Sequence, residues 1–210
     1  TMNKIIILDC CHSGKFGNPS DLSSTTSVIN EGLTILTASR ASESAIEVNG
    51  HGVFTNLLLS ALNGGAADLL GHITPGSVYA YIDKALGLWD QRPVFKTNVT
   101  YFTSLRDVKV QVPIEILRNI TKYFPNALDE HKLDPSYEDT NSNDIDHKVI
   151  EPYANPNNVK IFKELQQMQS IGLVVPVDTE HMYFAAMKSK SCKLTSLGQH
   201  FWRLNKDGRY

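Results

Sequence analysis

The sequence predicts an α/β protein in which a mostly parallel sheet flanked by helices is followed by a smaller α+β domain. Three observations support this fold class. An uninterrupted, β-branched apolar run at residues 5–8 is typical of a central strand covered on both faces. Apolar residues then recur alternately at strand and helix spacing as far as about residue 102. The pattern changes near residues 108–113, so we expect one domain over 1–108 and a second over 109–210.

The first domain can be followed element by element. A loop rich in Ser, Thr, Asn, Gly and Pro is expected directly after the first strand, which places the end of that strand at the protein surface. The elements expected after this loop are a strand at 33–38, a largely buried helix at 53–62, and a helix beginning at Thr74 and Pro75. Strands that alternate with helices in this way imply a mostly parallel sheet.

The second domain is expected to combine helices with a hairpin. Pro113 opens a helix, and an acidic linker is expected near residues 134–156. A further amphipathic helix ends at Gly172. A hairpin is expected from the apolar runs at 173–177 and 182–187, and the segment Leu-Thr-Ser-Leu-Gly at 194–198 is expected to begin a last helix.

Composition limits the classes of function. The chain has 210 residues, 41% of them hydrophobic, which is enough for two modest cores. A net charge of −2 indicates no general affinity for nucleic acid or anionic membranes. Three cysteines, an odd number without paired metal-ligand spacing, favour a reducing compartment and predict no metal site. Neither a signal peptide nor a membrane-spanning apolar run is visible, so we expect a cytoplasmic protein without membrane contacts.

Two motifs resemble those of one enzyme family. The segment Asp-Cys-Cys-His-Ser-Gly at 9–14 is similar to the Asp-x-Cys-His-Ser-Gly signature of metacaspases and other bacterial caspase-like cysteine peptidases. Residues 35–55, which include Gly-His-Gly-Val-Phe-Thr at 50–55, resemble the strand and helix that follow the nucleophile in that family. The resemblance covers about residues 3–106, and within it residues 91–95 followed by 99–102 are similar to the last small-subunit strand of the family. It implies a caspase-like fold and a regulated cysteine endopeptidase, of a kind associated with bacterial cell death or defence.

The resemblance assigns the nucleophile to Cys11, with Cys10 at a variable position. A thiol of ordinary pKa is only a few per cent ionised at neutral pH, so a neighbouring histidine must take its proton. Caspase-like chains carry that histidine about 50 residues upstream of the cysteine. The resemblance therefore implies that the general base is not in this chain, and that the N-terminal part of the same protease is a partner. His12 is a weaker candidate because adjacent strand residues point to opposite faces, and we expect a structural role for His51.

Asp9 is the candidate for substrate selection. It precedes Cys11 by two positions and shares its face if the strand geometry continues that far. In the metacaspase-like branch this aspartate lines the primary pocket, which implies cleavage of protein or peptide substrates after Arg or Lys through a charge-assisted pair. The alternative is that Asp9 caps the turn after the strand. The resemblance also suggests substrate contacts at Ser39 and from a second acid, for which Glu43 is the nearest residue.

The C-terminal domain resembles a winged helix, a fold that often binds DNA. From 109 to 210 there are 13 Lys or Arg and 13 Asp or Glu, whereas phosphate binding requires a basic excess. We therefore expect a protein partner for this domain rather than nucleic acid. The alternative for the whole chain is a catalytically inactive, caspase-like pseudo-protease that acts as a protein- or DNA-binding module.

No cofactor is expected. Asp139, Asn141 and Asn143 have the spacing that begins a calcium-binding loop. Asp144 and Ile150, however, occupy positions that require glycine and a bidentate glutamate, which argues against that calcium site. The sequence leaves a calcium requirement of the peptidase undecided.

Overall fold

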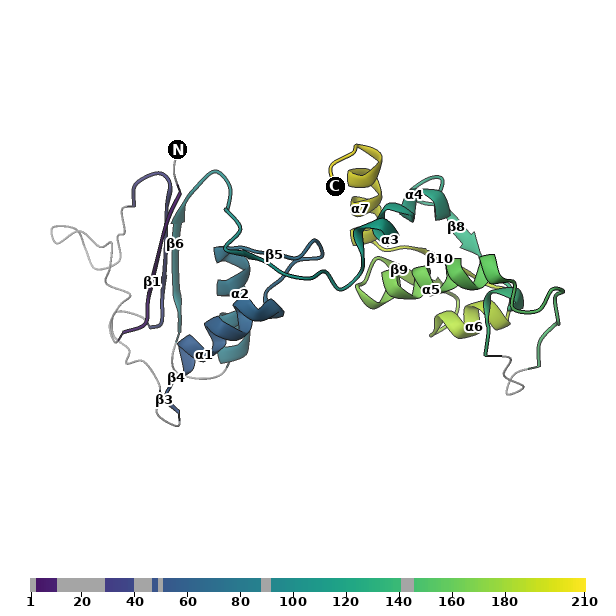
Figure 1. The fold of residues 1–210 in the computed structure, drawn as a ribbon, viewed down its shortest axis with the longest axis horizontal. Helices are drawn as coiled ribbons and strands as arrows, with labels where there is room; N and C mark the ends of the chain where they lie inside the picture. The colour runs from purple at the N-terminus through teal and green to yellow at the C-terminus, as the bar shows by residue number, and fades with distance from the viewer. Residues whose placement is uncertain (1–2, 11–28, 40–46, 49–50, 88–91, 141–145) are drawn as a thin grey trace. The chain divides into compact units, whose positions relative to one another are not determined.

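The computed structural model describes residues 3–10, 29–39, 47–48, 51–87, 92–140 and 146–210. The chain is a mixed α/β protein that divides into two compact units, Thr1–Lys109 and Val110–Tyr210. Each unit has its own small sheets and helices and is described by itself (Figure 1).

The first unit is built on a three-stranded sheet with the order β1-β2-β6, formed by β1 (Lys4–Leu8), β2 (Leu33–Thr37) and β6 (Val94–Asn98). β1 and β2 are parallel, with Lys4 opposite Leu33 and Leu8 opposite Thr37. β2 and β6 are antiparallel. The described sheet therefore contains one parallel and one antiparallel pair, and the expected mostly parallel sheet is not confirmed.

The first strand differs from its prediction. In the described sheet β2 is central and β1 lies at an edge. Ile7 of β1 is 37% exposed, whereas Ile35 and Leu36 of β2 are each 1% exposed. The prediction of a central position for residues 5–8 is therefore wrong for the described sheet. An uninterrupted apolar run gives the conformation of a strand, but its position in the sheet depends on partners distant in sequence.

Two helices, α1 (Val53–Ser60) and α2 (Pro75–Leu86), lie on one side of this sheet (Figure 1). Both were predicted. Phe54, Val78, Ile82 and Leu86 from the helices pack with Leu36 of β2 in one buried apolar cluster. α2 begins as predicted at Thr74 and Pro75, where Thr74 and Ser77 form a reciprocal capping box. α1 continues into a π-helical turn, η2 (Ala61–Gly65).

Two short two-stranded ladders complete the first unit. β3 (Glu47–Val48) pairs with β4 (His51–Gly52), directly before α1. β5 (His72–Ile73) pairs with β7 (Arg106–Asp107), near the end of the unit. The last strand, expected over residues 91–95 and 99–102, is shorter in the structure, because β6 ends at Asn98 and residues 99–102 lie outside it.

The β5–β7 ladder carries an exposed His–Asp pair that predicts a pH response. His72 Nδ1 lies 2.8 Å from Asp107 Oδ1, and this hydrogen bond raises the pKa of His72. The same bond, followed by one from Ser104, lowers the pKa of Asp107. For a raised histidine pKa, the stabilisation is complete below the ordinary value near 6.5 and disappears as pH rises through the raised value. For the lowered Asp107 pKa, it is lost as pH falls through that value.

We therefore expect an NMR titration to place the pKa of His72 above its ordinary value, and Asp107→Asn to return it toward that value. Asp178→Asn, which removes an exposed carboxylate from the other unit, is the matched control. A His72 pKa that is unaffected by Asp107→Asn would show that this pair does not form. Because both side chains are largely exposed, the contribution to stability is small.

The second unit contains a three-stranded antiparallel sheet, with the order β8-β10-β9, packed with helices. Its elements, in chain order, are α3 (Ile114–Arg118), α4 (Ile120–Tyr123), β8 (Glu130–Lys132), η3 (Pro135–Tyr137), α5 (Pro156–Ser170), β9 (Val174–Val177), α6 (Met182–Met187), β10 (Ser191–Leu194) and α7 (Ser196–Lys206). Trp202 of α7 is buried, and its Nε1 donates a 2.6 Å hydrogen bond to the Phe124 carbonyl. This bond ties the last helix to the end of α4.

The predicted hairpin is only half correct. β9 forms as expected, but residues 182–187 form helix α6, and β10 is the strand that pairs with β9. The segment Met-Tyr-Phe-Ala-Ala-Met buries Met182, Ala185 and Ala186, which is the i, i+3, i+4 spacing of a helix. Methionine and alanine also favour helix, so the prediction of a strand over residues 182–187 is wrong.

In its described residues, 134–140 and 146–155, the segment expected as an acidic linker contains only the short 3-10 helix η3, and part of it is packed. Ser136 and Glu138 are buried, although both are polar. Asn158 of α5 donates a 2.8 Å hydrogen bond to Ser136 Oγ, and Lys163 of α5 pairs with Asp139 at 2.5 Å. Residues 134–139 therefore line one side of α5.

In the described residues, no helix is long and apolar enough to cross a membrane.

Candidate active site at the carboxyl edge of the sheet

The parallel pairing of β1 and β2 brings two chain segments to the same edge of the sheet. Asp9 and Cys10 follow β1, and Ala38 and Ser39 follow β2. The Ala38 N–H donates a 2.9 Å bond to the Leu8 carbonyl, which continues the ladder beyond the assigned strands. Open α/β sheets place their functional residues at the carboxyl ends of such strands. This edge is therefore the candidate site.

Asp9 lies against the start of α1. The Thr55 hydroxyl, in the first turn of that helix, donates a hydrogen bond to Asp9 Oδ2. The backbone of Gly52 is so close that a Cβ atom there would lie 2.9 Å from the same oxygen. Asp9 is nevertheless an exposed residue. Its carboxylate is thus held on one side by the protein while the residue remains open to solvent.

Ser39 is fully buried, and its polar atoms form hydrogen bonds at this edge of the sheet. Its hydroxyl donates a 3.4 Å hydrogen bond to the Cys10 carbonyl, and its own carbonyl accepts a 3.1 Å bond from the Thr37 hydroxyl. The first of these bonds joins the segment after β1 to the segment after β2, and the second lies within the β2 segment. The structure therefore brings Ser39 and Asp9 to the same edge, with Ser39 engaged inside the protein.

The remaining predicted residues lie outside the described part of the chain. They are the nucleophile Cys11, the weaker base candidate His12 and the possible second acid Glu43. Cys10, the last described residue before this gap, is exposed and has a free thiol. Thr55 and Gly52 were not predicted as site residues. Their only signal was the Gly-Val-Phe-Thr segment, and nothing in its spacing indicated contact with Asp9.

The third cysteine has a different environment. Cys192 is a free thiol buried in the second unit. Burial raises its pKa to about 12, and the charge of Glu130 adds to this shift. A thiol with so high a pKa has almost no thiolate at neutral pH and is a poor nucleophile. Its environment agrees with the expectation that Cys192 is a small buried residue.

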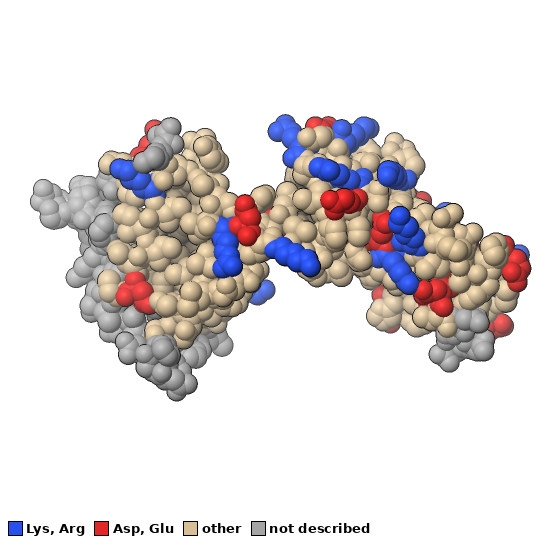
Figure 2. All heavy atoms as spheres, viewed as in Figure 1, with Lys and Arg blue, Asp and Glu red and all other residues tan. Residues whose placement is uncertain are grey.

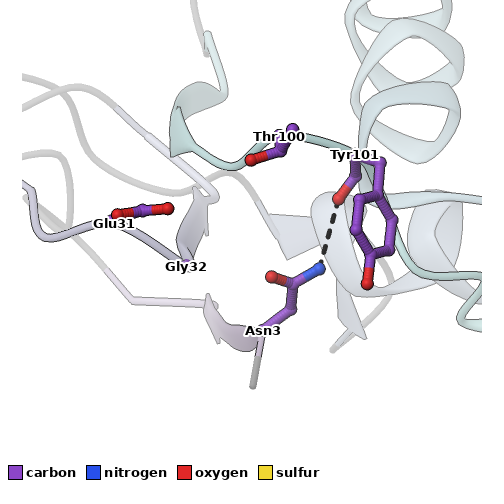
Figure 3. A pocket seen from close by; sticks show the side chains of 5 residues that line it. All are labelled: Asn3, Glu31, Gly32, Thr100 and Tyr101. Atoms are coloured by element: carbon purple, nitrogen blue, oxygen red, sulfur yellow. Dashed lines mark hydrogen bonds between the residues drawn. The ribbon is translucent and has the colours of Figure 1, made fainter. Parts of the chain in front are cut away.

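The first unit also has a small pocket away from the candidate site. It has a volume of about 50 Å³ and is lined by Asn3, Glu31, Gly32, Thr100 and Tyr101 (Figure 3). Asn3 precedes β1 and Gly32 precedes β2, so the pocket lies at the amino edge of the sheet, opposite Asp9. Asn3 Nδ2 donates a 3.2 Å hydrogen bond to the Tyr101 carbonyl across it.

Among the residues that the structure describes, no group of three or more His, Cys, Asp or Glu side chains could hold a metal ion. Comparisons with family models, curated proteins and solved structures find no match to this chain.

Proposed function

We propose that this chain carries the nucleophile and the substrate selector of a cysteine endopeptidase that cleaves proteins after Arg or Lys. The observation that supports this proposal best is the setting of Asp9. It is an exposed carboxylate at the carboxyl edge of the sheet, two residues before Cys11, and it is oriented by a contact with Thr55. A fixed carboxylate forms a charge-assisted pair with a basic side chain, and a bidentate pair with Arg.

In the proposed mechanism, the Cys11 thiolate attacks the carbonyl carbon of the residue after which the substrate is cut. Backbone N–H groups, including that of Cys11, stabilise the resulting oxyanion. The tetrahedral intermediate then expels the amine, which takes a proton from the histidine that the resemblance expects outside this sequence. A thioester acyl-enzyme remains. Water adds to this thioester, the same histidine takes the proton of the water, and the acid product leaves with regeneration of the thiolate.

We further propose that the first unit is part of a caspase-like domain. The parallel pairing of β1 with β2, the motif residues at their carboxyl ends and the two helices on one side of the sheet support this assignment. The protein is expected to act in the cytoplasm, on the basis of its cysteine content and composition.

For the second unit we propose a winged-helix-like module that docks a protein partner. Its strand order, with β10 between β8 and β9, and the helix α5 before β9 support this arrangement. Figure 2 shows Asp and Glu side chains among the Lys and Arg side chains of its visible face. With equal numbers of acidic and basic residues over 109–210, this unit lacks the basic excess of a phosphate-binding surface.

A pair of peptide substrates tests the selector. One peptide has Arg before the scissile bond, and the other has citrulline, which keeps the shape of Arg without its charge. For the full-length protein we expect a kcat/KM ratio of Arg to citrulline of about 100 or more, because only the charged Arg side chain forms a charge-assisted, bidentate pair with the Asp9 carboxylate. Asp9→Asn is expected to reduce this ratio toward one by lowering the kcat/KM for Arg.

Asp178→Asn is the matched control, because it removes one exposed carboxylate from a turn of the second unit. It should leave the ratio unchanged. An Asp9→Asn protein with the wild-type ratio would refute the selector. Absence of any Cys11-dependent cleavage by the full-length protein would favour the alternative of an inactive, caspase-like binding module.

A further inference from the structure

We infer that Thr55 is a positioning residue for substrate selection, which acts by orienting the carboxylate of Asp9 for a basic side chain. This inference rests on the proposed function and extends it to the first turn of α1. Thr55 lies 46 positions after Asp9 in the sequence, and its hydroxyl donates to Asp9 Oδ2. The two residues therefore join the end of β1 to the start of α1.

The hydrogen bond fixes the carboxylate without using up its acceptor capacity. An ionised carboxylate has about four lone-pair sites on its two oxygens. Thr55 occupies one of them, on Oδ2, which leaves sites on both oxygens for a guanidinium or ammonium group. Because the residue is exposed, the Asp9 side chain would otherwise sample several rotamers, and each substrate would have to immobilise it on binding.

Gly52 supplies the second constraint on the carboxylate. Its backbone occupies the space beside Oδ2, and a Cβ atom would approach that oxygen to 2.9 Å, inside normal contact distance. The backbone of Gly52 has an ordinary extended conformation, with φ −64° and ψ 125°. Glycine is therefore needed here for the close approach to Asp9 rather than for backbone freedom. Any larger residue would have to displace the carboxylate from Thr55.

The test uses the full-length protein and the same Arg and citrulline peptides. Thr55→Val keeps the shape of the side chain but removes the hydroxyl. We expect it to lower kcat/KM for the Arg peptide about tenfold and to leave the citrulline peptide nearly unchanged, since a hydrogen bond to a charged group is lost. Thr55→Ser retains the hydroxyl and should keep the wild-type ratio. Gly52→Ala should lower the ratio as Thr55→Val does.

A double-mutant cycle separates positioning from a general structural role. If Thr55 acts through Asp9, Thr55→Val should have no further effect on the ratio in an Asp9→Asn background. Equal losses on both peptides, or an undiminished effect without the Asp9 carboxylate, would overturn the inference. If the Arg-to-citrulline ratio changes in Asp9→Asn but not in Thr55→Val, the role of Thr55 is refuted and the proposed selector Asp9 is retained. An unchanged ratio in Asp9→Asn would refute the proposed selector, and the role of Thr55 with it.

Discussion

Replacing Cys11 with alanine is expected to lower the rate of peptide cleavage by the full-length protein on the order of 10⁴-fold or more. The thiolate forms the covalent bond of the acyl-enzyme, and alanine has no nucleophilic group to form that bond. Measurement of kcat and KM on an arginyl peptide, under reducing conditions, gives the size of the loss. KM is expected to change much less, because the Asp9 carboxylate remains available to pair with the arginyl side chain.

The neighbouring cysteine provides the matched control. Cys10 is exposed, and its carbonyl accepts a hydrogen bond from Ser39, but its side chain has no role in the proposed mechanism. Cys10→Ala should therefore retain cleavage within a few-fold of wild type. The opposite result, with activity lost in Cys10→Ala and retained in Cys11→Ala, would show that Cys10 and not Cys11 is the nucleophile.

Gly198→Ala is expected to have the largest effect on stability, a loss of about 3 kcal/mol in the second unit. α7 approaches the residue before β9 so closely that a Cβ atom at Gly198 would lie 2.0 Å from the Leu173 carbonyl oxygen. That oxygen belongs to the backbone and accepts a 3.0 Å hydrogen bond from the Thr195 N–H, so it cannot move aside cheaply. Relief of the clash requires α7 to move away from its contacts, including the buried Trp202.

Hydrogen exchange measures this loss for the unit itself, through the protection of amides in α7 and β9. Ser196→Ala is the control, because Ser196 is an exposed residue in the same first turn of α7. It should change stability by less than about 0.5 kcal/mol. A similarly small effect of Gly198→Ala would show that Gly198 does not pack against the Leu173 backbone as described.

The sequence predicted the beginnings and ends of helices correctly where these depend on contacts between side chains and backbone within one short segment. Thr195 illustrates this: its hydroxyl caps α7 by accepting a 3.0 Å hydrogen bond from the Gly198 N–H, as the Leu-Thr-x-x-Gly pattern predicts. The capping box at Thr74 and the helix that ends before Gly172 are further examples. In each case the chemistry that begins or ends a helix lies within a few residues of the chain.

Signals that depend on distant partners were less reliable. Residues 5–8 form a strand, but the pattern could not show that β1 lies at an edge of the described sheet. Residues 182–187 are apolar throughout, a pattern that is compatible with the predicted strand, but they form α6. Short apolar runs carry little information on period, so the packing of the unit decides between helix and strand.

In the candidate site, too, a local motif could be predicted from the sequence, but contacts between distant segments could not. Asp9 could be chosen from the sequence because it lies two residues before Cys11 in a short motif. Its contacts with Thr55 and Gly52 could not, because they join segments more than 40 positions apart in the sequence. Such contacts follow from the register of β1 on β2 and from the packing of α1. The position of Cys11 itself lies outside the described residues.

Labelling of the full-length protein with an arginyl chloromethyl ketone, beside an aspartyl chloromethyl ketone, tests the central claim most directly. The thiolate displaces chloride to form a thioether, which peptide mapping assigns to one cysteine. Cys192 should remain unmodified, since its pKa is raised to about 12. We expect the arginyl probe alone to modify Cys11, and Cys11→Ala to abolish this labelling. Modification of Cys11 by the aspartyl probe, or by neither probe, would contradict an Arg- or Lys-directed cysteine peptidase.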